Sequence, residues 1–585
     1  MRNCNTPTGD LPHYEPADFA GDKPPCDLIM KGGITSGVVY PFAITELARR
    51  YRFASIGGTS AGAIAAGVAA AAEYGRDKDG FLRLAEIPEE VSERLLSLFQ
   101  PAPRYRPVFR TFLSALGDRP AASKAATLVG AALLNHLWAT LIGLIPGAVL
   151  TVHALREGAG WSVWAVTALL LVLGPLLAVA GAAALTLFRG LPSTLFGVCP
   201  GLRQPGRSVP GLTDWLADIL ERVAGRTGPD GARPPRPLTF GDLKGRGIDL
   251  NVMTTNLSMR RPYRLPAEMT EFFWRRGDFE QLFPDWVLRH LIALAPPQAL
   301  PDCPEAYPFP AIEDLPVIVA VRMSLSFPVL LASVPLYTRD FSYRLSEEER
   351  QRARVCWFSD GGISSNFPIH FFDNLWPSRP TFAISLDAHH PDRHGPEGRD
   401  ENRVHMPREA GTGLLIPVSG MGGILSFLGA IVGAAKDWQD VMQSVLSGYR
   451  ERIAHIALTS EEGGLNLRMR AEKVRLLSRF GYLAGCEMHR FDFDEHRWRR
   501  YLVALARIEE TLHGLTTNYE ETYRDFLAGY ARCAKSYEQP EGWIDEALRN
   551  TDALMRVAAE TVEDPLRARG QIPKPETDIR ISPRL

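Results

Sequence analysis

Residues 52–75 read RFASIGGTSAGAIAAGVAAAAEYG, and the fold expected for the chain depends on this stretch. A short apolar run predicts a strand over Phe53–Ile56, and the Ala-rich run over Ala61–Tyr74 predicts a helix. Between them, Gly58-Thr59-Ser60-Ala61-Gly62 fits G-x-S-x-G, a sharp strand-to-helix turn that exposes a nucleophilic serine. Its two outer glycines allow close approach of two backbones. The alternative is a packed Gly/Ala-rich helix in which Ser60 merely caps the N-terminus.

The composition narrows the class of protein. The 585 residues suggest two to four domain-sized units. The formal net charge is -2, so no basic surface for nucleic acid is expected. The seven cysteines form no C-x-x-C pair, which indicates neither a zinc site nor a disulfide framework, and they are typical of reduced thiols in a protein that faces the cytosol. The first 25 residues are polar and Pro-rich, so no secretory signal is expected.

Two long uncharged runs predict membrane helices. Ala125–Leu155 and Trp161–Phe188 contain no Asp, Glu, Lys or Arg, and each exceeds the roughly 20 residues that span a bilayer core. The polar turn Arg156–Gly160 joins them, so residues 116–190 are expected to form a transmembrane hairpin. The alternative is two buried helices of a large soluble core. Basic residues on both flanks favour the cytoplasmic side for each end: Arg104, Arg106, Arg110, Arg119 and Lys124 before the hairpin, and Arg189, Arg203 and Arg207 after it.

A third uncharged run, Ala410–Ala435, differs because it holds seven glycines and a proline. We interpret it as an amphipathic or re-entrant flap that meets lipid, and a buried helix-loop-helix remains the alternative. Beyond about residue 465, charged segments with a period of 3.6 residues predict a helical C-terminal region.

Further apolar runs predict strands, several of which end in glycine or in a polar side chain. Cys26–Met30 runs into the Gly-rich stretch 32–37, and Val355–Phe358 is followed by Asp360 and two glycines. The pattern indicates a mainly parallel sheet flanked by helices, and sites in such sheets form outside the carboxyl ends of the strands. Gly32, Ser60 and Asp360 are therefore expected to meet in one crevice. The other expected strands are Ile248–Asn256, Pro316–Pro328 and Thr381–Ala388.

These segments supply the groups that acyl transfer requires. A serine hydroxyl needs a base within hydrogen-bond reach, and Asp360 at the end of its own strand is the candidate. The oxyanion that forms on attack needs donors, and the amides of a Gly-rich turn provide them without side chains in the way. The stretch GGITSG, residues 32–37, is the candidate for that turn.

In this order, the Gly-rich loop, the G-x-S-x-G serine and the D-G-G aspartate resemble the patatin-like phospholipases. The segments 238–243, 250–258, 321–331 and 360–368 are also similar to that family. The resemblance implies a patatin-like α/β fold and a Ser-Asp dyad without histidine, metal or organic cofactor. It implies Ser60 as nucleophile and Asp360 as base. It also assigns Gly32, Gly33, Ile34 and Gly37 to the oxyanion hole, Gly58 and Gly62 to the elbow, and Gly361 and Gly362 to the D-G-G motif.

The chain departs from the family at Ser36, where a basic residue is usual. A positive charge that would favour a phosphate headgroup is therefore missing. The expected substrate is a membrane phospholipid or another lipid ester, with the bilayer as partner. The expected division of the chain is a flexible segment 1–25, a first core part 26–115, the hairpin 116–190, a second core part 191–460, a helical region 461–564 and a tail 565–585.

Three alternatives stay open. His370, His389 or His390 would complete a Ser-Asp-His triad of the α/β-hydrolase type, since these residues follow Asp360. The His-rich run 387–395 resembles a metal cluster faintly. A catalytically silent membrane scaffold would keep the fold without the chemistry. A channel built from hairpins is poorly supported, because the hairpin carries no charge within the membrane.

Overall fold

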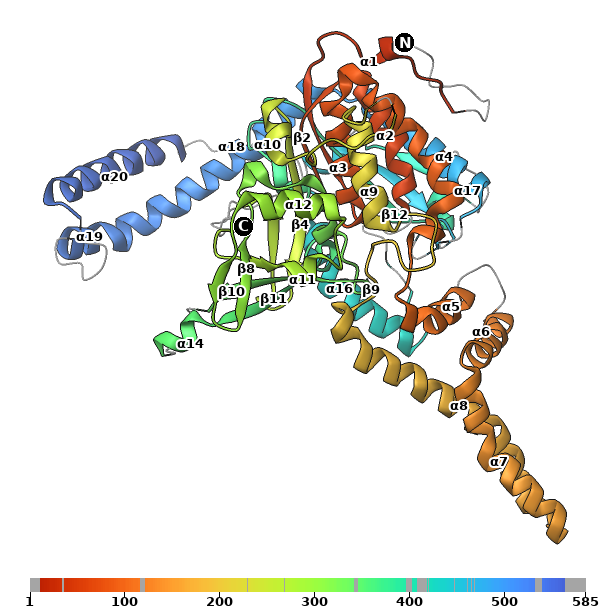
Figure 1. Ribbon diagram of the computed structural model, residues 1–585. Coiled ribbons are helices and arrows are strands. Elements are labelled where there is room, and N and C mark those ends of the chain that lie inside the picture. Colours follow the sequence, from red (N-terminus) through yellow and green to blue (C-terminus); the bar gives the residue numbers. More distant parts are fainter. Residues whose placement is uncertain are drawn as a thin grey trace.

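The structure is a computed structural model in which a central sheet is surrounded by helices, with a helical hairpin and a C-terminal helical arm projecting from the body (Figure 1). It describes residues 11–33, 36–115, 121–228, 230–267, 269–340, 346–395, 402–407, 418, 420–446, 448–459, 461–463, 466–467, 469–531 and 539–562. The first ten residues and the predicted tail 565–585 therefore lie outside the described residues.

One half of the sheet is parallel and the other half is antiparallel. The parallel half has the order β14 (Ile453–Leu458), β12 (Thr381–Ala388), β1 (Pro25–Met30), β2 (Arg52–Thr59) and β4 (Asp249–Asn256). The antiparallel half continues from β4 through β11 (Ala353–Asp360), β10 (Val334–Arg339), β6 (Phe273–Arg275), β8 (Cys303–Pro308) and β7 (Gln298–Leu300). Two further strands, β5 (Arg261–Leu265) and β13 (Val404–His405), pair antiparallel with β4 and β14. The protein is thus a mixed α/β protein, and its sheet is less parallel than predicted.

The Ala-rich helix α3 (Ala61–Tyr74) follows β2 as predicted and is buried along nearly its whole surface. Its small side chains permit close packing: a Cβ on Gly67 would lie 2.7 Å from Cγ2 of Val321. Val321 belongs to α13 (Val317–Ser324), where the sequence predicted a strand. That prediction was wrong because every residue of this short helix is buried, and an apolar run of this length has no period that separates a buried helix from a buried strand.

The expected hairpin is present as two long apolar helices, α7 (Leu137–Glu157) and α8 (Trp161–Gly190). By length and composition each could cross a membrane. Most of their side chains are exposed, which contradicts the alternative of two buried core helices. They pack closely through glycine, since a Cβ on Gly174 would lie 2.2 Å from the Gly143 carbonyl oxygen. The first uncharged run is not one helix, because the chain leaves the helical conformation at His136, between α6 (Ala121–Asn135) and α7.

The hairpin returns directly into the body. A 3₁₀ turn, η4 (Leu191–Thr194), follows α8 and leads into β3 (Gly197–Cys199). β3 pairs in parallel with β9 (Val329–Leu331) in a separate two-stranded sheet. At the end of α8, Gly190 packs against Tyr105, whose hydroxyl would lie 2.5 Å from an added Cβ. The end of the hairpin is therefore integrated into the packing of the body.

The C-terminal region is helical, as predicted, and its first helix belongs to the body. α17 (Ala471–Met488) packs on α2 (Tyr40–Ala48), and a Cβ on Gly481 would lie 2.0 Å from the Val39 carbonyl oxygen. The arm then extends outward through α18 (Phe493–Asn518), a π-helical turn (Tyr519–Tyr523), α19 (Arg524–Tyr530) and α20 (Glu541–Val562) (Figure 1).

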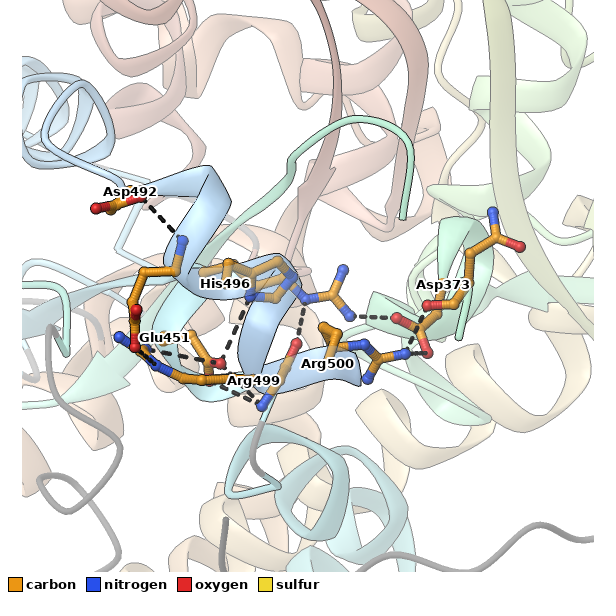
Figure 2. Close-up of polar contacts among 10 residues, drawn as sticks. Asp373, Glu451, Asp492, His496, Arg499 and Arg500 are labelled. Atoms are coloured by element: carbon orange, nitrogen blue, oxygen red, sulfur yellow. Dashed lines mark hydrogen bonds and ion pairs between the residues drawn. The ribbon is translucent and has the colours of Figure 1, made fainter. Parts of the chain in front are cut away.

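Ion pairs fix the base of this arm to the body (Figure 2). Arg500 of α18 contacts Asp373 at 3.1 Å and donates to the Asn374 carbonyl. His496 Nδ1 lies 3.5 Å from Oε1 of the buried Glu451. Asp492 caps α18 by accepting from the Glu495 amide at 3.0 Å.

The remaining helices are α1 (Pro16–Phe19), η1 (Ser36–Val39), η2 (Arg76–Lys78), α4 (Gly80–Leu98), η3 (Pro103–Tyr105), α5 (Arg106–Ala115), α9 (Leu212–Val223), α10 (Phe240–Gly245), α11 (Arg276–Phe279), α12 (Asp285–Leu294), η5 (Ile312–Asp314), α14 (Glu347–Gln351), η6 (Gly361–Ile363), η7 (Ile369–Phe372), α15 (Pro391–His394), α16 (Ile424–Ser444) and η8 (Arg450–Arg452).

Candidate active site

Ser60 sits at a strained turn between β2 and α3. Its backbone has φ 56° and ψ -126°, a conformation that non-glycine residues rarely adopt. The turn is crowded by backbone on both sides. A Cβ on Gly58 would lie 2.2 Å from the Gly62 carbonyl oxygen, and one on Gly62 would lie 2.3 Å from that of Met30. Both outer positions of the G-x-S-x-G pattern therefore require glycine, and the expected strand-turn-helix surrounds Ser60.

Asp360 lies beside this serine. Ser60 Oγ donates to Asp360 Oδ2 at 2.7 Å, and both side chains are buried. The other carboxylate oxygen, Oδ1, accepts from the Gly362 amide at 2.8 Å. The D-G-G glycines are also confined, because a Cβ on Gly361 would lie 2.0 Å from the Met253 carbonyl oxygen. These contacts fix the orientation of the carboxylate toward Ser60.

The two residues meet in a different way from the one that the sequence indicated. β11 was expected to join the parallel strands and to present Asp360 at a shared carboxyl edge. It runs antiparallel to β4 and overlaps it only through Phe358, Ser359 and Asp360. Asp360 therefore reaches the site from the opposite direction. The apolar pattern of β11 could not reveal this, because a short apolar run has the same pattern whichever way the strand runs in the sheet.

The Gly-rich loop lies against the serine. A Cβ on Gly32 would lie 3.2 Å from that of Ser60, and one on Gly37 would lie 3.5 Å from that of Ala61. The Gly32 amide donates to the Asn366 carbonyl at 2.8 Å, so this N–H is engaged within the protein. Gly33 is packed over the Ser36 hydroxyl, which would lie 2.5 Å from an added Cβ. Ile34 lies outside the described residues.

Lys31, directly before the loop, is held by a small charged network that the sequence reasoning missed. Its Nζ lies 3.1 Å from Asp387 Oδ1 at the end of β12, and Asp387 Oδ2 contacts His455 Nδ1 at 2.7 Å. Burial disfavours the ionised carboxylate, but Lys31 and His455 outweigh it and hold the pKa of Asp387 well below its ordinary value. The network fixes the start of the loop. The one feature of the sequence that pointed to this network was a lysine next to two glycines.

A second contact that the sequence reasoning missed supports the loop from the other side. Asp440 of α16 accepts hydrogen bonds from the Asn366 and Phe367 amides at 2.6 and 2.9 Å, and from the Ser365 hydroxyl at 2.8 Å. Asn366 is also the partner of Gly32. Nothing in the sequence marks this aspartate, which lies 80 positions beyond Asp360 in a helix without other site residues.

An apolar cavity of 110 Å³ opens onto Ser60. Ser60 and Gly37 contribute to its wall, and apolar side chains from α2, α3, α4 and α9 and from residues 325–331 form almost all the rest. Such a lining offers a hydrocarbon chain burial and offers a polar substrate no partner. Representative lining residues are Ile64, Ala65, Val91, Trp215, Phe327 and Leu331.

The described hydrogen bonds of the three candidate histidines are with groups other than Ser60 and Asp360, and those of His389 and His390 are made by the backbone amide, not by the imidazole. His370 Nδ1 lies 3.3 Å from Gln443 Oε1, and burial lowers the pKa of this imidazole. The His389 amide donates to Leu458, and the His390 amide donates to His394 Nδ1.

Within the described ranges, no group of three or more His, Cys, Asp or Glu side chains could hold a metal ion. The described cysteines are buried and form no disulfide among themselves: Cys26, Cys199, Cys303, Cys356 and Cys486.

Comparison with known proteins places the chain in a family. It is 32% identical over 643 aligned positions to the RpoH suppressor of Rhizobium meliloti (strain 1021), covering 95% of this chain and 98% of that protein. The chain belongs to the RpoH suppressor family. No family model matches it. The crystal structure of VipD from Legionella pneumophila aligns over 92% of this chain and 85% of that chain at 13% identity, with a TM-score of 0.31 that is too low to indicate a shared fold.

Proposed function

We propose that this protein is a membrane-anchored serine acyl hydrolase of the patatin-like type that cleaves ester bonds of membrane lipids. The observation that carries the proposal is the 2.7 Å hydrogen bond from Ser60 Oγ to Asp360 Oδ2 at a strained turn. A serine in this setting has a base within reach and a glycine-rich loop beside it. The apolar cavity that opens onto the serine supports an acyl chain as the group that is bound.

The reaction proceeds in two steps. Ser60 Oγ attacks the ester carbonyl carbon while Asp360 takes the hydroxyl proton. Collapse of the tetrahedral intermediate expels the alcohol, which receives that proton, and leaves an acyl-enzyme. Water then attacks the acyl-enzyme with Asp360 again as base, and the fatty acid departs. The Gly33 and Gly37 amides are the proposed oxyanion donors, since the Gly32 N–H is bonded to Asn366. The dyad needs neither metal nor organic cofactor.

The hairpin supplies the proposed anchor. α7 and α8 are each long and apolar enough to cross a bilayer, and basic residues flank both ends of the hairpin. The catalytic body is therefore proposed to lie on the cytoplasmic face, within reach of phospholipid or other lipid esters. Anchoring keeps the local concentration of lipid substrate high.

A fluorophosphonate probe tests the nucleophile. Full-length protein in detergent should be labelled, Ser60→Ala should not be, and Ser346→Ala, at the exposed cap of α14, should be labelled like wild type. Ser60→Ala should also retain less than about 1% of the hydrolysis of a lipid panel read by mass spectrometry. If the wild-type protein is neither labelled nor active, the catalytically silent scaffold is the better interpretation.

A further inference from the structure

Helix α16 presents a stripe of exposed apolar side chains. Ile424, Phe427, Leu428 and Ile431 have exposed fractions of 70%, 49%, 52% and 51%, and their spacing places them on one side of the helix. This exposure contradicts the alternative of a buried helix-loop-helix for the described part of the run 410–435; residues 410–417 and 419 of that run lie outside the described residues. Single exposed apolar residues are ordinary on a protein surface, but a continuous stripe indicates a contact surface.

The other end of α16 is bonded to the candidate active site. Asp440 accepts the Ser365, Asn366 and Phe367 hydrogen bonds, and Gln443 lies 3.3 Å from His370. Asn366 connects this segment to the Gly-rich loop, because its carbonyl accepts from the Gly32 amide at 2.8 Å. Only Asn366 therefore lies between Asp440 of α16 and Gly32 of the loop. A displacement of α16 would act on the loop beside Ser60 through this one residue.

The chemistry of the stripe fits a bilayer surface. Residues 420–435 contain no Asp, Glu, Lys or Arg, so the stripe offers no ion pair to a protein partner. Lys436 and Asp437 begin the charged end of the helix, and the neighbouring Trp438 is 63% exposed. A tryptophan at the boundary between apolar and charged residues is typical of a helix at the membrane interface. In Figure 1, α16 lies on the side of the body from which the hairpin projects, which is the side that the proposed anchor turns toward a bilayer.

We infer that α16 is a second membrane contact, which lies in the plane of the interface and couples lipid contact to the Gly-rich loop through Asp440. The lipid contact stands independently of catalysis, whereas the coupling rests on the proposed function. The hairpin then anchors the protein, and α16 transmits the presence of lipid to the site.

A fluorescent probe tests the contact. Full-length protein with Cys4 and Cys533 changed to serine is labelled with an environment-sensitive dye at Phe427→Cys and reconstituted into phosphatidylcholine–phosphatidylglycerol vesicles. The dye should be quenched by lipids that carry a nitroxide on the acyl chain, and should be at least threefold less accessible to aqueous iodide than the same dye at Leu554→Cys on the exposed face of α20. Equal iodide access at the two sites overturns the proposal. Iodide protection without nitroxide quenching also overturns it, because a protein then covers the stripe.

Paired kinetics test the consequence for lipid turnover. Phe427→Asp with Ile431→Asp should lower hydrolysis of vesicle lipid at least tenfold and leave hydrolysis of a soluble short-chain ester within twofold of wild type. The matched pair Leu554→Asp and Val557→Asp on α20 should change neither rate. An equal loss on both esters overturns the proposal. If the wild-type protein hydrolyses neither ester, the proposed function and the coupling fail, while the dye still decides the lipid contact.

A change at Asp440 tests the coupling itself. Asp440→Asn should lower kcat about tenfold on the soluble ester with KM unchanged, and Asp440→Glu should recover part of it. The dye at position 427 should remain quenched by lipid in both variants. An unchanged kcat in Asp440→Asn would overturn the coupling, because the loop would then not depend on α16.

Discussion

Ser60 and Asp360 lie 300 positions apart in the chain, yet Ser60 Oγ and Asp360 Oδ2 are 2.7 Å apart. The second carboxylate oxygen, Oδ1, accepts a hydrogen bond from the Gly362 amide. One oxygen therefore holds the carboxylate in place, and the other accepts from the serine hydroxyl. The whole hairpin and most of the antiparallel half of the sheet are encoded between the two residues. The pair therefore forms only when the long segment between the two residues has folded so that β4 and β11 lie side by side.

Asp360→Asn should reduce hydrolysis by at least a thousandfold, because an amide of the same shape cannot accept the serine proton. His370→Ala, His389→Ala and His390→Ala should each keep most of the activity, since Asp360 is already hydrogen-bonded directly to Ser60 and the described contact of the His370 imidazole is with Gln443. The measurement is turnover of a soluble ester, with circular dichroism as the check on folding. A folded histidine variant as inactive as Asp360→Asn would replace the dyad with a triad.

Gly62→Ala should destabilise the fold by about 2–3 kcal/mol, because the new Cβ would overlap the Met30 carbonyl oxygen. Gly514→Ala is the matched control: it also lies in a helix, but no atom lies within 4 Å of the added Cβ. It should stabilise α18 by about 0.5–1 kcal/mol through helix propensity. Thermal unfolding of both variants gives the comparison. Equal Tm values would mean that the turn is looser than the structure indicates.

Ala65→Phe should shorten the acyl chain that the protein accepts. Ala65 lines the cavity, and a phenyl ring there would occupy space beside Ile64 and Val68. Hydrolysis of long-chain esters should fall at least tenfold relative to short-chain esters, while labelling by the small fluorophosphonate persists. An unchanged ratio of long-chain to short-chain rates in a protein that is still labelled would show that the acyl chain binds elsewhere.

The protein should lose stability as the pH falls from 6.5 to 4, partly through His489. Burial, together with the neighbouring Arg50, lowers the pKa of this imidazole from 6.5 to about 4. The unfolded chain then binds the proton more readily, so the contribution of His489 is complete above pH 6.5 and is lost as the pH falls toward 4. The contribution of His489 to the free energy of unfolding is at most about 3 kcal/mol. The pKa of the adjacent Glu46 is raised by burial, and its protonation in the folded state offsets part of the loss.

The drop in Tm between pH 7 and pH 5 should consequently be smaller in His489→Gln than in wild type. His405, whose pKa burial also lowers to about 4, should retain its own share of the drop in both proteins. A drop of the same size in His489→Gln would show that His489 is protonated equally well in the folded and unfolded chains.

Local patterns in the sequence predicted the parts of the site that a single turn determines. The glycines around Ser60 and after Asp360 are required by contacts of 2.0–2.9 Å to an added Cβ, and such positions leave a visible signature. The direction of a strand leaves no such signature in the sequence, so the antiparallel course of β11 was not predicted. Asp440 and the Lys31–Asp387 pair were missed because a polar side chain that supports a loop from a distant helix or strand has no fixed spacing from it.

Replacing Ala121–Thr186 with a short Gly/Ser linker should convert the protein from an integral to a peripheral membrane protein. The cut preserves Gly190 against Tyr105 and the pairing of β3 with β9, so the body should stay folded. The variant should be extracted by carbonate and should keep its rate on a soluble ester, but should act more slowly on vesicles. A carbonate-resistant variant would identify another segment as the anchor, and a folded but inactive one would make the hairpin part of the catalytic core.

The direct passage of α8 into η4 and β3 has a geometric consequence. No free linker separates the last apolar helix from the body, since Gly190 is already packed and Gly197 already pairs with Val329. An α-helix turns by about 100° and rises about 1.5 Å with each residue. One residue inserted into α8 would therefore rotate the body about the helix axis by more than a quarter turn and raise it only slightly. The number of residues in α8 thus sets the rotation of the body about the axis of this helix, as well as the distance of the body from the tip of the hairpin.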